Sequence, residues 1–283
     1  MQNPPNFNGP PQYEIHAPNL TTGEFKEHDN DQNIGVALIL GVGIVGLTAN
    51  LIAIVVIIKT KTLHNCFGYL LFVHAVAEAI VLSIFIFWTV PITIIDDSLA
   101  KTWVGVKIGH LVQVAYYTVI YSQLFKAVNR LIAIISPIHY RNYFTDKNAK
   151  FYVPGPVIFG FIQGCVYFFP GCGFFFDSRV LLWNYAQSDC YNFVKEGIDL
   201  GWCLGLMSLV ILIDIITLVS IIKTNAMHGQ SSKEFKFFIQ TFSTSIMYLI
   251  MIILTQIVSD VIESYWGIFL ITTMTWEICH AID

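Results

Sequence analysis

Charged side chains are scarce in this sequence. They make up 12% of its 283 residues, whereas 55% of the residues are hydrophobic and the mean hydropathy is +0.64. Soluble domains carry about 25% charged residues, so this composition excludes an ordinary soluble domain. The first 30 residues also lack a basic stretch followed by an apolar core, which excludes a cleavable signal peptide of the usual kind. The sequence therefore predicts a membrane protein whose first apolar segment acts as a signal anchor.

Long runs with almost no charge indicate how the chain crosses the membrane. A helix needs roughly 20 apolar residues to span the hydrocarbon core, and seven segments reach or approach that length. No period of two dominates any of them, which argues against a β-barrel. We therefore predict an all-α membrane protein: a polar tail at 1–33, then a bundle of seven transmembrane helices over 34–283. The expected spans are 34–58, 67–95, 107–136, 151–170, 200–222, 237–260 and 266–283.

The last span is the shortest. From Trp266 to Asp283 there are about 18 residues, or roughly 27 Å of helix, which barely crosses a core of about 30 Å. We expect the seventh helix to be truncated.

The distribution of Lys and Arg predicts the orientation. With the N-terminus outside and the C-terminus inside, the inner loops hold ten of these residues and the outer segments five. A glycosylation sequon at Asn19 agrees, because a glycan there requires an outer tail.

Two of the six cysteines, Cys172 and Cys190, fall in the long outer connection between spans four and five. That side is oxidising, so we expect a disulfide between them; two free, buried thiols are the alternative. The bridge would close a loop of about 17 residues, worth roughly 3 kcal/mol.

The stretch "NRLIAIISPIHY" at 129–140 ends the third span. Arg130 lies 23 residues after Lys107, about 34 Å along a helix, and so reaches the inner interface. The run Asn129-Arg130-Leu131, followed by Pro137 and Tyr140, resembles the end of the third helix in rhodopsin-like G protein-coupled receptors.

The first two spans carry the same resemblance. Gly46 and Asn50 match the glycine–asparagine pattern of helix one, and Glu78 stands where such receptors usually have an aspartate. The stretches "FGYLLFVHAVAEAIVLSIFIFWTVP" and "TTMTWEICHAID", with the two outer cysteines, are more closely similar to nematode serpentine chemoreceptors of class X. The resemblance implies a chemosensory receptor, and no enzyme, in the plasma membrane of sensory neurons. It would bind a small odorant or pheromone-like molecule in an outer helical pocket and signal through a heterotrimeric G protein.

The sequence departs from the rhodopsin-like pattern in several places. Gly105 replaces the usual helix-three cysteine, and spans five and six lack their prolines. Asn129 replaces the acid beside the arginine, so an ionic lock must reach across helices, and we expect Glu234 to be the resting partner of Arg130.

Ionisable residues within spans are rare and usually functional. Glu78 and Glu277 lie near the midplane, and Asn50 reaches the same layer, so together with His280 they predict a polar network. In receptors of this kind the layer holds water or a sodium ion, so the resemblance allows a structural Na⁺ near Glu78; no other cofactor is expected. A protonated Glu78 with a neighbouring hydrogen-bond partner is the alternative.

The outer half of span three predicts ligand contacts. Val112 occupies the position where amine receptors place an aspartate, so an ammonium ligand is not expected there. Gln113 and Tyr116 match pocket-facing positions, and the aromatic, neutral surroundings suit a small apolar ligand. Packing against other helices or lipid is the alternative.

Other classes of function remain as alternatives. His74 and Glu78, with Glu277, His280 and Asp283, resemble metal ligands and would suit an intramembrane metal-dependent hydrolase, although no HExxH motif occurs. A small transporter or channel would use the midplane carboxylates, but no inverted repeat is evident. A non-signalling chaperone or decoy is a third alternative. The expected partners are a small ligand, a G protein and lipid, without nucleic acid; a homodimer through GxxxG motifs is allowed.

Overall fold

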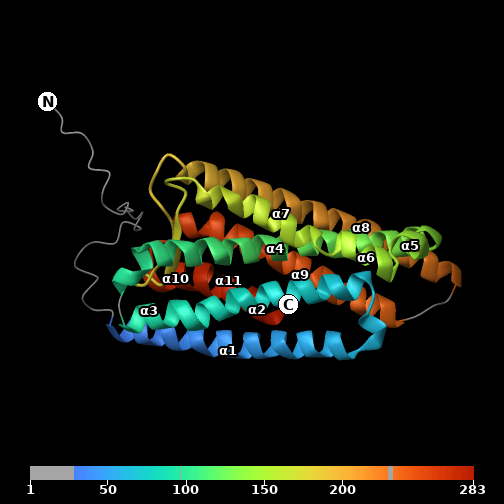
Figure 1. Cartoon of the computed structure of the whole chain (residues 1–283), viewed down its shortest axis with the longest axis horizontal. Coiled ribbons are helices and arrows are strands. Elements are labelled where there is room, and N and C mark those ends of the chain that lie inside the picture. Colours follow the sequence, from blue (N-terminus) through green and yellow to red (C-terminus); the bar gives the residue numbers. More distant parts are fainter. Residues whose placement is uncertain (1–28, 96, 229–231) are drawn as a thin grey trace.

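The structure is a computed structural model that describes residues 29–95, 97–228 and 232–283. It is an elongated bundle of nearly parallel and antiparallel helices (Figure 1). Six helices in the described part of the chain are long and apolar enough to cross a membrane: Asp31–Lys59, Cys66–Ile95, Trp103–Ile135, Asn148–Phe168, Phe193–Lys223 and Phe238–Val261.

These spans are built from the following elements. The first four spans and their connections are α1 (Asp29–Lys59), η2 (Lys61–Leu63), α2 (Cys66–Ile84), η3 (Phe85–Thr89), α3 (Val90–Ile95), η4 (Asp97–Lys101), α4 (Trp103–Ile135), α5 (Pro137–Tyr143), α6 (Asp146–Tyr152), α7 (Gly155–Gly164) and η5 (Cys165–Phe168). A hairpin of β1 (Phe174–Asp177) and β2 (Leu182–Tyr185) follows, then η6 (Phe193–Trp202), α8 (Cys203–His228), α9 (Ser232–Gln256) and η7 (Val258–Val261).

The seventh segment of the bundle consists of three short consecutive helices. They are α10 (Tyr265–Phe269), η8 (Leu270–Met274) and α11 (Thr275–Ile282). This segment lies against α1, α2 and α9, so it completes the bundle. The predicted all-α serpentine membrane bundle is confirmed, with six candidate spans and a shorter seventh helical segment in the described residues, whereas its orientation in the membrane stays a prediction.

Among the described residues, three segments of the bundle are π-helical: η3, η6 and η8. Each lies in the half of its span that is nearer the β-hairpin. A π-helix inserts an extra residue into a turn and so re-aims the side chains around it, and such insertions are frequent at functional sites. The half of the bundle near the hairpin is therefore where these helices depart from regular geometry.

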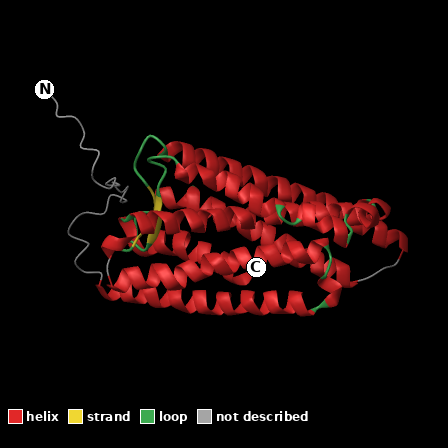
Figure 2. Cartoon of the chain, viewed as in Figure 1, coloured by secondary structure: helices red, strands yellow, loops and turns green. Residues whose placement is uncertain are grey.

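The β-hairpin closes one end of the bundle (Figure 2). Its strands are antiparallel, with Phe174 opposite Tyr185, and all four residues of β1 are buried. The backbone of Phe174 lies directly against Gly109 of α4, where no Cβ could fit. Thr273 of η8 donates a hydrogen bond to the Leu181 carbonyl at 2.6 Å. Contacts with two spans thus hold the hairpin inward.

The outer faces of the helices are apolar and exposed. On α1, the side chains of Ile34, Val45 and Leu51 are half or more exposed, and α7 and α8 show similar residues. Exposed apolar surface on this scale is covered by lipid in a protein whose spans cross the membrane.

Small residues allow close contact between two of the spans. A Cβ at Gly160 or Gly164 of α7 would collide with Thr118 or Val114 of α4. This GxxxG motif therefore serves packing within the chain. A second set of glycines with the same spacing, Gly197, Gly201 and Gly205, is exposed. A homodimer through these glycines stays a proposal.

Candidate functional site

Arg130 is buried near the end of α4 that lies away from the hairpin. Its Nη2 lies 2.6 Å from Oδ1 of Asp214 on α8, and their exposed fractions are 7% and 0%. The second carboxylate oxygen of Asp214 accepts a hydrogen bond from Ser245 of α9 at 3.0 Å. One carboxylate therefore connects three helices, and we call Arg130, Asp214 and Ser245 the Asp214 latch.

The predicted lock partner of Arg130 was Glu234. The Glu234 side chain lies outside the described part of the chain, so that contact stays a prediction. In the described part, Arg130 pairs with Asp214. Nε and Nη1 of Arg130 are buried and have no hydrogen-bond partner among the described residues.

The rest of the "NRLIAIISPIHY" stretch forms the junction of α4 with α5. Pro137 is the first residue of α5, where its missing N–H is not needed. The Tyr140 hydroxyl donates to Oδ1 of Asn129 at 3.2 Å, while Leu131 is half-buried. Burial raises the pKa of Tyr140, so the hydroxyl keeps its proton and remains the donor. Asn129 thus connects α4 to α5.

Asn50 joins α1 to α11. Its Nδ2 donates to the carbonyls of Gly46 and His280, each at 3.1 Å. A Cβ at Gly46 would lie 2.7 Å from Cα of Ala281, so only glycine permits this approach. The glycine–asparagine pattern of the first span therefore explains one helix contact.

Glu78 is the centre of the midplane network. It is fully buried and accepts hydrogen bonds from the Tyr248 hydroxyl of α9 and from Nδ1 of His280. Nε2 of His74, one turn earlier on α2, lies 3.3 Å from its Oε1. Nε2 of the same imidazole lies 2.6 Å from Oδ2 of Asp283. Helices α2, α9 and α11 therefore meet at this carboxylate.

Glu277 lies apart from that network. Both of its carboxylate oxygens are buried and have no hydrogen-bond partner among the described residues. Its Oε1 faces Gly43 of α1 and would lie 2.9 Å from a Cβ added to that glycine. The Ile86 side chain lies against the same position of Gly43. Of the four residues predicted for the midplane network, the structure brings together Asn50, Glu78 and His280.

Asp199 occupies the centre of a second buried cluster, close to the hairpin. This carboxylate, in η6, accepts hydrogen bonds from the hydroxyls of Tyr117, Tyr167 and Tyr185 and from Nε2 of Gln113. The distances from Tyr167 and Gln113 are 3.1 Å each. Burial and the charge of Asp199 raise the pKa of Tyr185, so its hydroxyl remains a donor. We call these five residues the Asp199 cage.

Of the residues predicted for the ligand pocket, Gln113 belongs to this cage, and Val112 and Tyr116 lie on the same helix. Val112, Gln113 and Tyr116 are all buried on α4. The Tyr116 ring packs edge-on against Trp276 of α11, with centroids 5.7 Å apart. Trp276 packs in turn against a group of rings from η3, β1 and β2: Phe85, Phe174 and Trp183.

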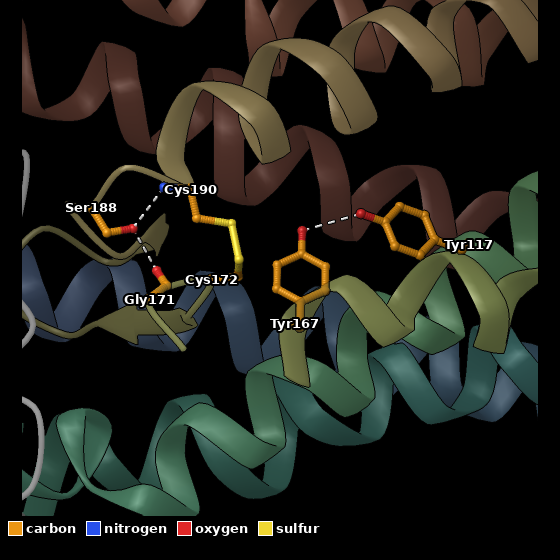
Figure 3. The surroundings of a disulfide bond; sticks show 6 residues. All are labelled: Tyr117, Tyr167, Gly171, Cys172, Ser188 and Cys190. Atoms are coloured by element: carbon orange, nitrogen blue, oxygen red, sulfur yellow. Dashed lines mark hydrogen bonds between the residues drawn. A yellow bond between two sulfur atoms is a disulfide. The ribbon is translucent and has the colours of Figure 1, made fainter. Parts of the chain in front are cut away.

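Cys172 and Cys190 form the predicted disulfide, with their Cα atoms 5.3 Å apart. Ser188 supports the closed loop by donating to the Gly171 carbonyl and accepting from the Cys190 amide (Figure 3). Tyr167, in η5 just before this loop, points toward Tyr117 (Figure 3). The bridge therefore lies next to the Asp199 cage. The predicted glycosylation site, Asn19, lies outside the described residues.

Comparison with known proteins decides the family. The family described as "Serpentine type 7TM GPCR chemoreceptor Srx" matches residues 40–283. The chain belongs to this family. It is also 21% identical over 275 residues to "Serpentine receptor class X 45" of Caenorhabditis elegans, an alignment that covers 88% of this chain and 76% of that protein. This Srx protein is thus a multi-pass plasma-membrane protein of a chemoreceptor family.

Several residues of the three buried polar clusters could not be singled out from the sequence of this Srx protein. Asp214 was visible as the only charge within span five, which by itself marks a functional candidate. Asp199 stands just before that span and gave no such signal. Ser245 and Tyr248 are polar residues in an apolar helix, a pattern too common to single them out.

Proposed function

We propose that this Srx protein is a chemosensory receptor that couples the binding of a small molecule to activation of a heterotrimeric G protein. The supporting observation is the polar face of α9. Gln256 donates to the Tyr185 hydroxyl of the Asp199 cage at 3.2 Å, Tyr248 donates to Glu78, and Ser245 donates to Asp214. One helix therefore contacts all three buried polar clusters.

These contacts link the two ends of the bundle mechanically. Gln256 and Ser245 are 11 residues apart on α9, or about 16 Å along the helix. A change at the Asp199 cage that displaces the Gln256 end of α9 would also shift Tyr248 and Ser245. Loss of the Ser245 contact would weaken the attachment of α9 to α8, and Arg130 would become available to a G protein once its pair with Asp214 also breaks.

The chemistry of the cage suggests what kind of ligand would move it. Aromatic rings around Tyr116 and Trp276 offer apolar contact, and Asp199 is a single acceptor surrounded by hydroxyl donors. A small, largely apolar molecule with one donor group would replace a tyrosine hydroxyl on Asp199. With the predicted orientation, this cage would face the outside and Arg130 the cytosol.

Agonist-stimulated nucleotide exchange tests this function. The full-length receptor would be reconstituted with G proteins and exposed to small apolar molecules with and without one donor group. We expect exchange with members of the first set in wild type and none in Arg130→Ala. Arg179→Ala, the same change at the hairpin, should keep coupling. Equal responses of wild type and Arg130→Ala would contradict the proposal.

A further inference from the structure

We propose that His74, Glu78 and Asp283 form a binding site for a divalent transition-metal ion, with Zn²⁺ as the best match. Three atoms face one another there: Nε2 of His74, Oε1 of Glu78 and Oδ2 of Asp283. The histidine nitrogen lies 3.3 Å from the glutamate oxygen and 2.6 Å from the aspartate oxygen, and all three atoms lie within 4.8 Å of one another. The inference does not depend on coupling to a G protein.

The hydrogen bonds of Ser122 determine what His74 can do. The Ser122 hydroxyl donates to the Val119 carbonyl at 2.7 Å, so its oxygen is the acceptor toward Nδ1 of His74 at 2.5 Å. Nδ1 therefore carries a proton, and Nε2, on the other side of the ring, faces two carboxylates. Three electron-rich atoms converge, and a cation must lie between them or on one of them.

Each of the three groups is also oriented by a residue from another helix. Ser122 of α4 holds His74, Tyr248 of α9 holds Glu78, and Gln123 of α4 donates to Oδ2 of Asp283 at 2.7 Å. Metal ligands in proteins are typically fixed in this way by a further shell of hydrogen bonds. A salt bridge between mobile surface groups would not need such support.

The donor set and its spacing fit zinc. Zinc binds histidine nitrogen and carboxylate oxygen at about 2.0–2.2 Å, so neighbouring donors in a tetrahedral site are roughly 3.3 Å apart. The His74–Glu78 separation has this value, and the Asp283 oxygen needs to move by about 0.7 Å. Two carboxylates also neutralise a doubly charged ion, which matters in a buried site.

The imidazole distinguishes this ion from the sodium ion considered above. Imidazole suits Zn²⁺, Cu²⁺ and Ni²⁺, whereas Na⁺, like other hard cations, is held by oxygen. Gln123 Oε1 is buried without a hydrogen-bond partner among the described residues, so a water on the ion would satisfy it. The competing cation is a proton on Nε2 of His74, between the two carboxylates.

Cobalt binding to the full-length receptor, purified and stripped with a chelator, tests the site in the presence of Na⁺. We expect one Co²⁺ per receptor with visible d–d absorption of a low-coordinate site, and displacement by Zn²⁺. His74→Gln should abolish the band. Because that variant could fail to fold, Ser122→Ala provides a second test and should weaken Co²⁺ binding by about 10- to 100-fold.

The controls share the chemistry of the site but not its position. Glu277→Gln removes a buried carboxylate from α11, and His110→Gln removes a buried imidazole from α4; both should leave the cobalt band unchanged. No band in wild type would mean that the cation is a proton and would overturn the proposal. A band that survives both His74→Gln and Ser122→Ala would place the ion elsewhere and would overturn it equally.

Discussion

Nη2 of Arg130 lies 2.6 Å from Oδ1 of Asp214, and this ion pair fastens α4 to α8 within the membrane-spanning bundle. Both side chains are buried in this arrangement, so water does not replace either partner unless the helices move. Removing one partner of such a pair typically costs about 3–5 kcal/mol, because the other charge is left uncompensated. The pair is therefore a strong constraint on any rearrangement of these helices.

The first prediction concerns Asp214→Asn. The substitution keeps the shape of the side chain but leaves Arg130 without its counter-charge, so the latched arrangement loses stability. A loss of only about 1.4 kcal/mol would raise the ratio of active to resting receptor about tenfold. We expect nucleotide exchange without ligand to rise by about that factor or more, measured at equal receptor concentration.

Asp260→Asn is the matched control. Asp260 is exposed and pairs with Lys195 at 2.6 Å on the surface of the bundle. Exposed pairs contribute about 0–1 kcal/mol, so basal exchange should change little. Basal exchange in Asp214→Asn that is no higher than in Asp260→Asn would show that the latch does not restrain the receptor.

A second prediction separates the two contacts of the latch. Ser245→Ala removes the hydrogen bond between α9 and Asp214 but leaves the ion pair intact. A hydrogen bond to a charged group contributes about 1.5–3 kcal/mol, less than the ion pair. Basal exchange should rise above wild type and stay below Asp214→Asn. Ser243→Ala, an exposed serine that bonds only its own helix in the described contacts, should behave as wild type.

The Asp214 latch also shows which features of the structure can be predicted from the sequence and which cannot. The position of Arg130 near the membrane interface followed from a count of helical residues, and the disulfide followed from the position of two cysteines between spans. The identity of the Arg130 partner depends on how each helix is rotated about its axis. Depth along a helix can be counted from the sequence, but rotation is set by packing.

Glu277 and His280 illustrate the same limit. Both were placed at midplane depth, yet His280 faces Glu78 while Glu277 faces Gly43 and Ile86. Asp199 was missed for a different reason, because its partners come from three elements that are far apart in the sequence: α4, η5 and β2. A constellation of that kind exists only once the tertiary fold brings its members together.

The third prediction concerns the Asp199 cage. Asp199→Asn removes the carboxylate that accepts hydrogen bonds from the hydroxyls of Tyr117, Tyr167 and Tyr185. The new amide N–H groups would face these hydroxyl donors and find no acceptor. We expect a lower melting temperature and at least a tenfold loss of agonist potency. Glu196→Gln, one turn earlier in η6 and exposed, should change neither quantity. Unchanged potency in Asp199→Asn would exclude the cage from ligand binding.

The fourth prediction concerns the disulfide. Cys172→Ser opens a loop whose ends are 18 residues apart, which should cost roughly 3 kcal/mol in the chain-entropy model. Thermal unfolding should show the same loss for Cys172→Ser, for Cys190→Ser and for the double variant, because the bridge is lost in each. Cys165→Ser, at a free and half-buried thiol, should have a much smaller effect. Additive losses in the double variant would contradict a shared bridge.

The fifth prediction concerns the contact between α4 and the hairpin. A Cβ at Gly109 would collide with the Phe174 carbonyl, and a strand backbone cannot rotate away as a flexible side chain can. Gly109→Ala should therefore destabilise the receptor by about 1–3 kcal/mol and reduce hydrogen-exchange protection in β1. Gly205→Ala lies on a face of α8 where nothing lies within 4 Å of the added Cβ. This substitution should stabilise the receptor, since alanine favours a helix by about 0.5–1 kcal/mol over glycine. Equal effects of the two substitutions on stability would mean that the hairpin does not press on α4.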